Sequence, residues 1–165
     1  MIDTKIVENF NNTLQAEGLT IFCSESITAG LLASTIASVS GASSVLKGSI
    51  VTYDADLKIK ILSVDPSIIK EHTAESQETT DAMCIGLKNL YPSASLHVAV
   101  TGVASLPKDD SYVVNKEVGQ IYVSVMYKEQ LHKFSTVCKP KGDDERNSIR
   151  YKAVEYIFDQ ITKII

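Results

Sequence analysis

Hydrophobic positions recur with helical spacing near both ends of the chain. The first set predicts a helix that ends before Gly18, and the second predicts a long amphipathic helix up to the last residue. The apolar positions are Ile2, Ile6, Val7, Phe10 and Leu14 in the first helix, and Ile149, Ala153, Val154, Ile157, Phe158, Ile161 and Ile165 in the last.

Between these helices, short runs rich in β-branched and apolar residues indicate buried strands, and they alternate with helical segments. The expected strands are 19–23, 45–53 and 96–101, followed by a hairpin of 118–126 and 132–137 turned at 128–130. The expected helices are 31–39, a short piece containing Lys58, a short piece from Pro66, and 76–90, while the polar segment 102–116 is expected to be a surface loop.

This order of elements predicts an α/β fold. We expect a three-layer α/β/α sandwich around a mostly parallel, mixed sheet of about five strands. The length of 165 residues fits one domain, so we expect a single domain over 1–165.

Composition narrows the functional classes. The net charge of −4 argues against a nucleic-acid partner, because phosphate binding needs a basic face. No apolar run is long enough to span a bilayer, and the N-terminus lacks the pattern of a signal peptide, so we expect a cytoplasmic protein without a membrane partner. Cys23, Cys84 and Cys138 are expected to be buried free thiols, with no disulfide, no metal site and no cofactor.

Two predicted strands end in polar clusters, which is where open α/β sheets bind ligands. The strand 19–23 runs into the segment 24–30, and the strand 96–101 runs into Thr101 and Gly102. The first cluster opens a helix, whose free N–H groups would suit an anion. Alternatively, Ser26 or Thr28 serves only as an ordinary helix N-cap.

Serine and lysine side chains offer a second candidate for chemistry. Ser43 lies in a turn before a strand, Tyr53 ends that strand, and Lys58 follows on the next helix. Lys58 could act as a general base only if burial or a neighbouring cation lowers its pKa; otherwise it is an ordinary surface charge. The three histidines lack metal-binding spacing and make a poor case for a serine–histidine–aspartate triad.

Arg146 and Arg150 lie one turn apart at the start of the last helix. Two cations are mildly unfavourable at the positive end of a helix dipole, which hints at an anionic ligand or an acidic neighbour. The alternative is a pair of solvated side chains.

Taken together and in order, these clusters follow a pattern that runs roughly AESCTGG, PGxS, GxVxYxxxxK, GxVSxxxAxxMAxG, TGxAGP, KPxGxVY and GxRxxxR. The matching segments are 24–30, 41–43, 48–53 with Lys58, then Ser76 with Met83 and Gly86, then 101–104, Lys116 with 118–122, and Arg146 with Arg150. The chain thus resembles the CinA C-terminal domain family, whose characterised members are nicotinamide-nucleotide amidohydrolases. The resemblance covers nearly the whole chain.

The resemblance implies a three-layer α/β/α fold and hydrolysis of a carboxamide by a serine–lysine mechanism. By motif position, Ser43 is expected to be the nucleophile, Lys58 its base and Tyr53 a supporting hydroxyl. The expected substrate is nicotinamide mononucleotide, deamidated to nicotinate mononucleotide and ammonia; its phosphate would sit on a helix N-terminus or on Arg146. The residues expected to bind it are Ser26, Thr28, Gly30, Thr101, Gly102 and Arg146. The resemblance also makes a homodimer plausible and implies the stand-alone form of the domain.

Several positions depart from the family pattern. Ile27 and Ala29 replace Cys and Gly in the first motif, and Ser105 and Leu106 replace the Gly-Pro of TGxAGP. Glu117 stands at the position of a proline, and the spacing between Gly142 and Arg146 is longer by a residue or two. These departures keep two alternatives open: a non-catalytic nucleotide-binding or regulatory domain, and a serine–lysine hydrolase of another carboxamide.

Overall fold

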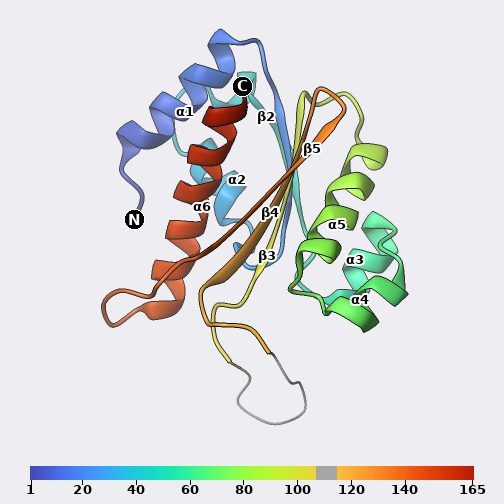
Figure 1. Cartoon of the computed structure of the whole chain (residues 1–165). Coiled ribbons are helices and arrows are strands. Elements are labelled where there is room, and N and C mark those ends of the chain that lie inside the picture. The colour runs from blue at the N-terminus through green and yellow to red at the C-terminus, as the bar shows by residue number, and fades with distance from the viewer. Residues whose placement is uncertain (107–114) are drawn as a thin grey trace.

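Five strands form one mixed sheet at the centre of the molecule (Figure 1). The computed structural model describes residues 1–106 and 115–165. The strands are β1 (Ile21–Glu25), β2 (Leu46–Val51), β3 (Leu96–Gly102), β4 (Gln120–Tyr127) and β5 (Gln130–Val137). Their spatial order is β2-β1-β3-β4-β5.

Strand directions follow the predicted pattern. β1 pairs in parallel with both β2 and β3, and β4 is antiparallel to both β3 and β5. β4 therefore runs against the other four strands. The hairpin between β4 and β5 turns at Lys128 and Glu129, which both have positive φ (47° and 62°), as a tight two-residue turn requires. The expected mostly parallel, mixed sheet of five strands is confirmed.

Helices cover both faces of the sheet, so the three-layer sandwich is also confirmed. On one face lie α1 (Thr4–Ala16), α2 (Leu31–Ala37) and α6 (Glu145–Ile164), and on the other lie α3 (Ala55–Leu62), α4 (Pro66–His72) and α5 (Gln77–Leu90) (Figure 1). A short 3₁₀ helix, η1 (Ala42–Ser44), precedes β2.

Each helical layer buries its own hydrophobic core against the sheet. On the first side, the rings of Phe10 and Phe158 stack with centroids 4.0 Å apart and join α1 to α6. On the other side, Leu62, Met83 and Leu87 are buried between α3, α5 and the sheet. A Cβ atom built on Gly86 would lie 1.8 Å from the Leu62 carbonyl oxygen. Only glycine therefore allows α5 to approach α3 this closely.

The helices on the second face begin where the sequence supplies an N-cap. Asp54 accepts from the Asp56 N–H at the start of α3, and Asp65 accepts from the Ser67 N–H at the start of α4. Ser76 accepts from the Thr79 N–H at the start of α5. These caps fix the turns that lead into α3 and α5, and both turns contribute to the site described below.

The segment expected to be a surface loop, 102–116, lies partly outside the described residues, because 107–114 are not described. Its first residues form part of a pocket wall.

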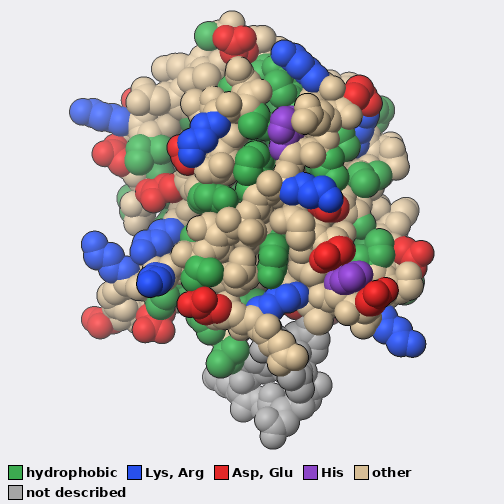
Figure 2. All heavy atoms as spheres, in the orientation of Figure 1, with side chains coloured by type: hydrophobic (Ala, Val, Ile, Leu, Met, Phe, Trp, Pro, Cys, Tyr) green, Lys and Arg blue, Asp and Glu red, His purple; other side chains and the backbone are tan. Residues whose placement is uncertain are grey.

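Charged side chains are scattered over the surface. On the face drawn in Figure 2, in the orientation of Figure 1, Lys, Arg, Asp and Glu side chains lie among hydrophobic ones. Within 1–106 and 115–165, no helix is long and apolar enough to cross a membrane.

Candidate active site

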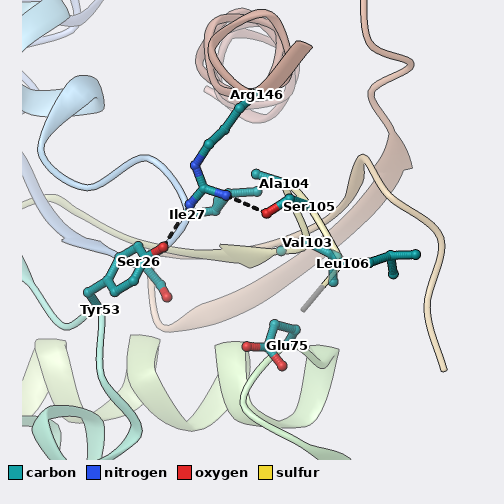
Figure 3. A pocket seen from close by; sticks show the side chains of 10 residues that line it. Ser26, Ile27, Tyr53, Glu75, Val103, Ala104, Ser105, Leu106 and Arg146 are labelled. Carbon is teal, nitrogen blue, oxygen red and sulfur yellow. Dashed lines mark hydrogen bonds between the residues drawn. The ribbon is translucent and has the colours of Figure 1, made fainter. Parts of the chain in front are cut away.

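A pocket of about 220 Å³ opens at the carboxyl ends of the parallel strands (Figure 3). Ser26 follows β1 and Gly102 ends β3, so the two neighbouring strands deliver the pocket floor. The lining residues are Ser26, Ile27, Tyr53, Glu75, Gly102, Val103, Ala104, Ser105, Leu106 and Arg146. This is the edge of the sheet at which α/β folds collect ligands.

Lys58 contacts Ser26, which lines the pocket. Its Nζ donates to Ser26 Oγ at 3.0 Å, to the Thr52 carbonyl at 2.6 Å and to the Tyr53 carbonyl at 3.2 Å. The side chain is only 1% exposed. Burial lowers the pKa of Lys58 from 10.5 to about 8, against the opposing effect of the carboxylates of Glu75 and Asp54.

These contacts orient the amine of Lys58. A neutral amine has two N–H donors and one lone pair. If the carbonyls of Thr52 and Tyr53 keep the two N–H groups, the lone pair points at the hydroxyl of Ser26. The lowered pKa makes the neutral form accessible near neutral pH. The arrangement is therefore that of a hydroxyl paired with an amine base.

Local structure fixes the position of Ser26. Its N–H donates to the Val100 carbonyl at 3.1 Å, which ties it to β3. The preceding residue, Glu25, is fully buried, and its carboxylate accepts from the N–H groups of Leu32 (2.9 Å) and Ala33 (3.0 Å) at the start of α2. A carboxylate at a helix N-terminus is a favourable pairing. Glu25 therefore anchors the turn that carries Ser26 between β1 and α2.

Arg146 closes another side of the pocket. Its guanidinium donates to Tyr53 Oη at 2.7 Å and to Ser105 Oγ at 2.7 Å (Figure 3). It thus joins α6 to the chain after β2 and to the chain after β3. An exposed guanidinium beside a pocket is a suitable group for binding a carboxylate or phosphate.

The structure does not bring Ser43 to Lys58, so the expected pairing of these two residues is corrected. Ser43 lies in η1, before β2, and its side chain is exposed. Lys58 binds backbone carbonyls that come directly after β2. Ser43 and the carbonyls that Lys58 binds therefore lie at opposite ends of β2, a strand of six residues with a backbone length of roughly 20 Å. The hydroxyl that Lys58 contacts is Ser26, which the resemblance had placed among the substrate-binding residues.

The other expected site residues divide into two groups. Gly102 lines the pocket, and a Cβ atom there would lie 2.5 Å from the Gln120 carbonyl oxygen, so only glycine fits. The described residues that line the pocket do not include Thr28, Gly30 or Thr101. These three shape the surrounding backbone.

Thr28, Gly30 and Thr101 each have a role in the local structure. The Thr28 carbonyl accepts from Arg150 at 2.6 Å, which gives this second arginine a structural partner. Gly30 holds the left-handed position (φ 91°) before α2. Thr101 Oγ1 is buried and lies 2.7 Å from Thr80 Oγ1 of α5.

Sequence reasoning missed Glu75, which contributes a carboxylate to the pocket wall. It lies in the turn between α4 and α5, immediately before the N-cap Ser76. The family pattern GxVS places valine at this position, and that difference was the available signal. Within the described part of the chain, no group of three or more His, Cys, Asp or Glu side chains is arranged to hold a metal ion.

Comparison with known proteins identifies the family of the chain. The family described as CinA C-terminal domain matches residues 3–165. This chain belongs to that family. A "CinA-like protein" of Petrotoga mobilis is 32% identical over 154 residues, which is 92% of this chain and 37% of that protein. Another of the same name from Prochlorococcus marinus is 41% identical over 106 residues, 64% of this chain and 24% of that protein. The chain spans about a third of the length of the first curated relatives it matches.

Solved structures share the fold across the whole chain. A competence/damage inducible protein from Agrobacterium tumefaciens has a TM-score of 0.83 at 25% identity and covers 97% of this chain and 93% of its own. A CinA superfamily protein from Klebsiella pneumoniae has a TM-score of 0.86 at 18% identity, covering 99% and 97%. The likeness at this lower identity shows the fold alone.

Proposed function

We propose that the protein is an amidohydrolase that uses Ser26 as its nucleophile and Lys58 as its general base. The observation that carries the proposal is the 3.0 Å contact between Lys58 Nζ and the Oγ of Ser26, which lines the pocket. A serine hydroxyl is a weak nucleophile unless an adjacent base takes its proton. A buried lysine with a pKa of about 8 can do so near neutral pH.

The reaction balances with these two side chains and water. Lys58 takes the proton of Ser26 as Oγ attacks the carboxamide carbon, and the tetrahedral intermediate forms. Its collapse breaks the C–N bond, and Lys58 gives the proton to the leaving nitrogen, which departs as ammonia. Water then attacks the acyl ester, again with Lys58 as base, and the proton returns to Ser26 as the carboxylic acid leaves.

Backbone N–H groups of the turn after Ser26 are the candidates for stabilising the oxyanion. The N–H of Ala29 donates to the Ser26 carbonyl at 3.1 Å, and that of Leu31 donates to the Thr28 carbonyl at 3.0 Å. The N–H group of Ile27, which lines the pocket next to Ser26, is therefore the candidate donor. One such donor is typically worth about 3 kcal/mol in the transition state.

The substrate supported by the family resemblance is nicotinamide mononucleotide, which would become nicotinate mononucleotide. Arg146 offers a guanidinium for its phosphate at the rim of the pocket. The Tyr53 hydroxyl accepts from Arg146, so its proposed role is to hold that cation in place rather than to relay a proton.

The test is release of ammonia by purified protein from nicotinamide mononucleotide and a panel of other carboxamides. Ser26→Ala and Lys58→Met are each expected to reduce turnover by at least about a thousandfold. Ser43→Ala is the matched control, because this serine is exposed and lies before β2, and it should retain wild-type turnover. Loss of turnover in Ser43→Ala with retention in Ser26→Ala would refute the assignment.

A second candidate is a domain that binds the nucleotide without hydrolysing it. The departures at the pocket wall favour it, since Ser105 and Leu106 line the pocket where the family pattern has Gly-Pro. It predicts saturable calorimetric binding of the mononucleotide with no ammonia from any amide in the panel. Turnover of amides other than the mononucleotide would instead identify a hydrolase of another substrate.

A further inference from the structure

The turn between α4 and α5 forms one wall of the pocket and has a constrained backbone. Thr73, just after α4, adopts φ 73° and ψ 166°, in the positive-φ region that a β-branched residue rarely occupies. The family pattern GxVS places glycine at this position. Residues hold such conformations only when surrounding contacts impose them.

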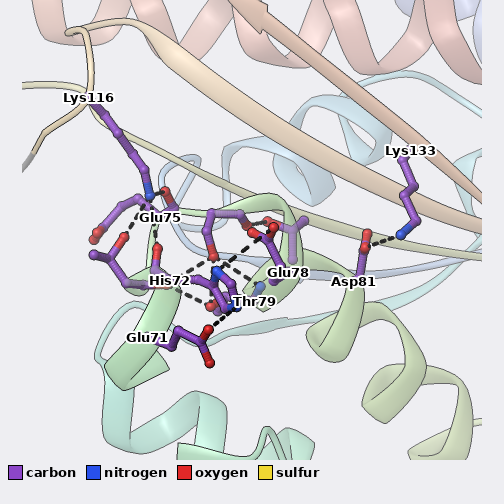
Figure 4. A network of polar contacts seen from close by, with 11 residues as sticks. Glu71, His72, Glu75, Glu78, Thr79, Asp81, Lys116 and Lys133 are labelled. Carbon is purple, nitrogen blue, oxygen red and sulfur yellow. Dashed lines mark hydrogen bonds and ion pairs between the residues drawn. The ribbon is translucent and has the colours of Figure 1, made fainter. Parts of the chain in front are cut away.

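Lys116 supplies those contacts from a distant part of the sequence. Its Nζ donates to Thr73 Oγ1 at 2.7 Å, to the His72 carbonyl at 3.1 Å and to the Glu75 carbonyl (Figure 4). All three acceptors belong to the same four-residue turn. Lys116 itself comes from the chain that leads into β4, so it joins the turn to the strand that borders β3.

Hydroxyls of α5 complete the anchoring of the turn. The Thr73 carbonyl accepts from Ser76 Oγ at 3.1 Å and from Thr79 Oγ1 at 2.7 Å. The backbone on both sides of Glu75 is thereby fixed. The Glu75 side chain lines the same pocket as Ser26 (Figure 3).

Glu75 acts on the amine of Lys58. Two carboxylates favour the charged form of that amine: Glu75 from the α4–α5 turn and Asp54 from the N-cap of α3. Glu75 also favours the charged form of Lys116, together with Glu78 of α5. The ammonium of Lys116, which binds the carbonyl of Glu75, thus also interacts favourably with the charge of its carboxylate.

We propose that Lys116 is a positioning residue of this site: by holding the 72–75 turn it keeps the Glu75 carboxylate at the wall of the pocket that Ser26 lines. At that wall the carboxylate favours the charged form of Lys58. The inference rests on the proposed function of Lys58 as base. Because the family pattern has valine at the position of Glu75, this adjustment is a feature of the present chain. It makes the site require a higher pH than it would with the family residue.

Two effects of Lys116 on Lys58 have opposite signs, which makes the proposal testable. Direct repulsion between the two ammonium groups favours neutral Lys58, so loss of the Lys116 charge alone would raise the pKa of Lys58. Release of Glu75 from the pocket wall removes a carboxylate from the neighbourhood, so it would lower the same pKa. The positioning role therefore predicts that Lys116→Met lowers the pKa of Lys58, although loss of the Lys116 charge alone would raise it.

The experiment measures the protonation of Lys58 itself by NMR, following its side-chain ¹³Cε signal as pH is raised. The signal is assigned by its loss in Lys58→Met. Glu75→Gln is expected to move the midpoint down by roughly half a pH unit or more. Lys116→Met should move it down as well, and Glu75→Gln/Lys116→Met should shift no further down than Glu75→Gln alone.

A matched control is available on the same face of the fold. Lys133 pairs with Asp81 at 2.6 Å, away from the turn (Figure 4), so Lys133→Met removes the same charge without touching residues 72–75. It should leave the Lys58 midpoint unchanged. Lys116→Arg, which keeps donors and charge, should retain most of the wild-type midpoint and serves as the test if Lys116→Met does not fold.

An upward shift in Lys116→Met, or an unchanged midpoint in Glu75→Gln, would overturn the proposal. Because the titration is read from the lysine signal, it tests the inference even if no amide is hydrolysed. Where turnover is found, the rising limb of kcat/KM against pH should move to lower pH in Glu75→Gln by the same amount as the NMR midpoint. A limb that stays in place while the NMR midpoint moves would refute Lys58 as the base and leave the positioning role intact.

Discussion

Lys58 is a buried cation, and its removal should change how the stability of the protein depends on pH. Lys58→Met keeps an unbranched apolar side chain of similar length while it deletes the amine. It also leaves the carbonyls of Thr52 and Tyr53 without this donor. The absolute stability of the variant therefore combines two opposing effects, but only the amine titrates.

The magnitude follows from the pKa of about 8, compared with 10.5 for the unburied group. Below the folded-state value both states hold the proton, so burial of the charged amine destabilises the fold by its full amount. Between the two values the unfolded chain binds more protons than the folded one, so stability rises with pH. A difference of about 2.5 pKa units corresponds to roughly 3 kcal/mol.

The assay is urea unfolding of wild type and Lys58→Met at a series of pH values from about 7 to about 10. The buried thiols of Cys23 and Cys84 have raised pKa values and act in the opposite sense over this range. They are present in both proteins, so the difference between the two proteins isolates Lys58. We expect this difference to move in favour of wild type by roughly 2–3 kcal/mol as pH rises. If the difference in unfolding free energy between the two proteins does not change with pH, the lowered pKa of Lys58 is refuted.

Two further predictions concern the pocket rim and the helix beneath it. Arg146→Ala should raise KM for an anionic amide by roughly tenfold or more with a small change in kcat, because a charge-assisted contact is lost; steady-state kinetics check this, and an unchanged KM would contradict it. Gly86→Ala should lower the free energy of unfolding in urea by about 3 kcal/mol, because the new Cβ meets the Leu62 carbonyl oxygen at 1.8 Å. Gly18→Ala is the control, since nothing lies within 4 Å of that site; only backbone strain of about 1 kcal/mol is expected, and equal losses would refute the steric explanation.

The fold could be predicted from the sequence because its elements have distinct hydrophobic patterns. The C-terminal helix has a long amphipathic pattern and the strand at 96–101 is a continuous apolar run, and both occur within a few residues of their predicted ends. Parallel pairing of β1 with β2 and β3 followed from the helices between them, since a crossover helix returns the chain in the same direction. The left-handed positions of Ala29 and Thr73 were not predicted, because they depend on tertiary contacts.

The site was predicted only in part. Lys58 was expected beside the hydroxyl of Ser43, but the hydroxyl that it contacts is that of Ser26. The expected topology contained the correction: Ser26 follows a parallel strand and Lys58 follows its neighbour, whereas Ser43 precedes that neighbour. Carboxyl ends of parallel strands meet at one edge of the sheet, so Ser26 and Lys58 belong together. The prediction of Ser43 followed the family motifs instead of this topology.

Glu75 could not be assigned from the pattern alone. Its place in the pocket depends on how Lys116, more than forty positions later in the chain, binds the turn. Contacts between such distant segments leave no periodic signal in a single sequence.

The anchoring of Lys58 by carbonyls only five and six positions earlier has a consequence for redesign of the site. The amine is oriented by its own short stretch of chain, whereas the wall at 103–106 comes from a separate connection after β3. Redesign of that wall to accept differently shaped ligands would thus leave the Ser26–Lys58 pair intact. Under the proposed function, selectivity and reactivity could then be evolved in the laboratory as independent modules.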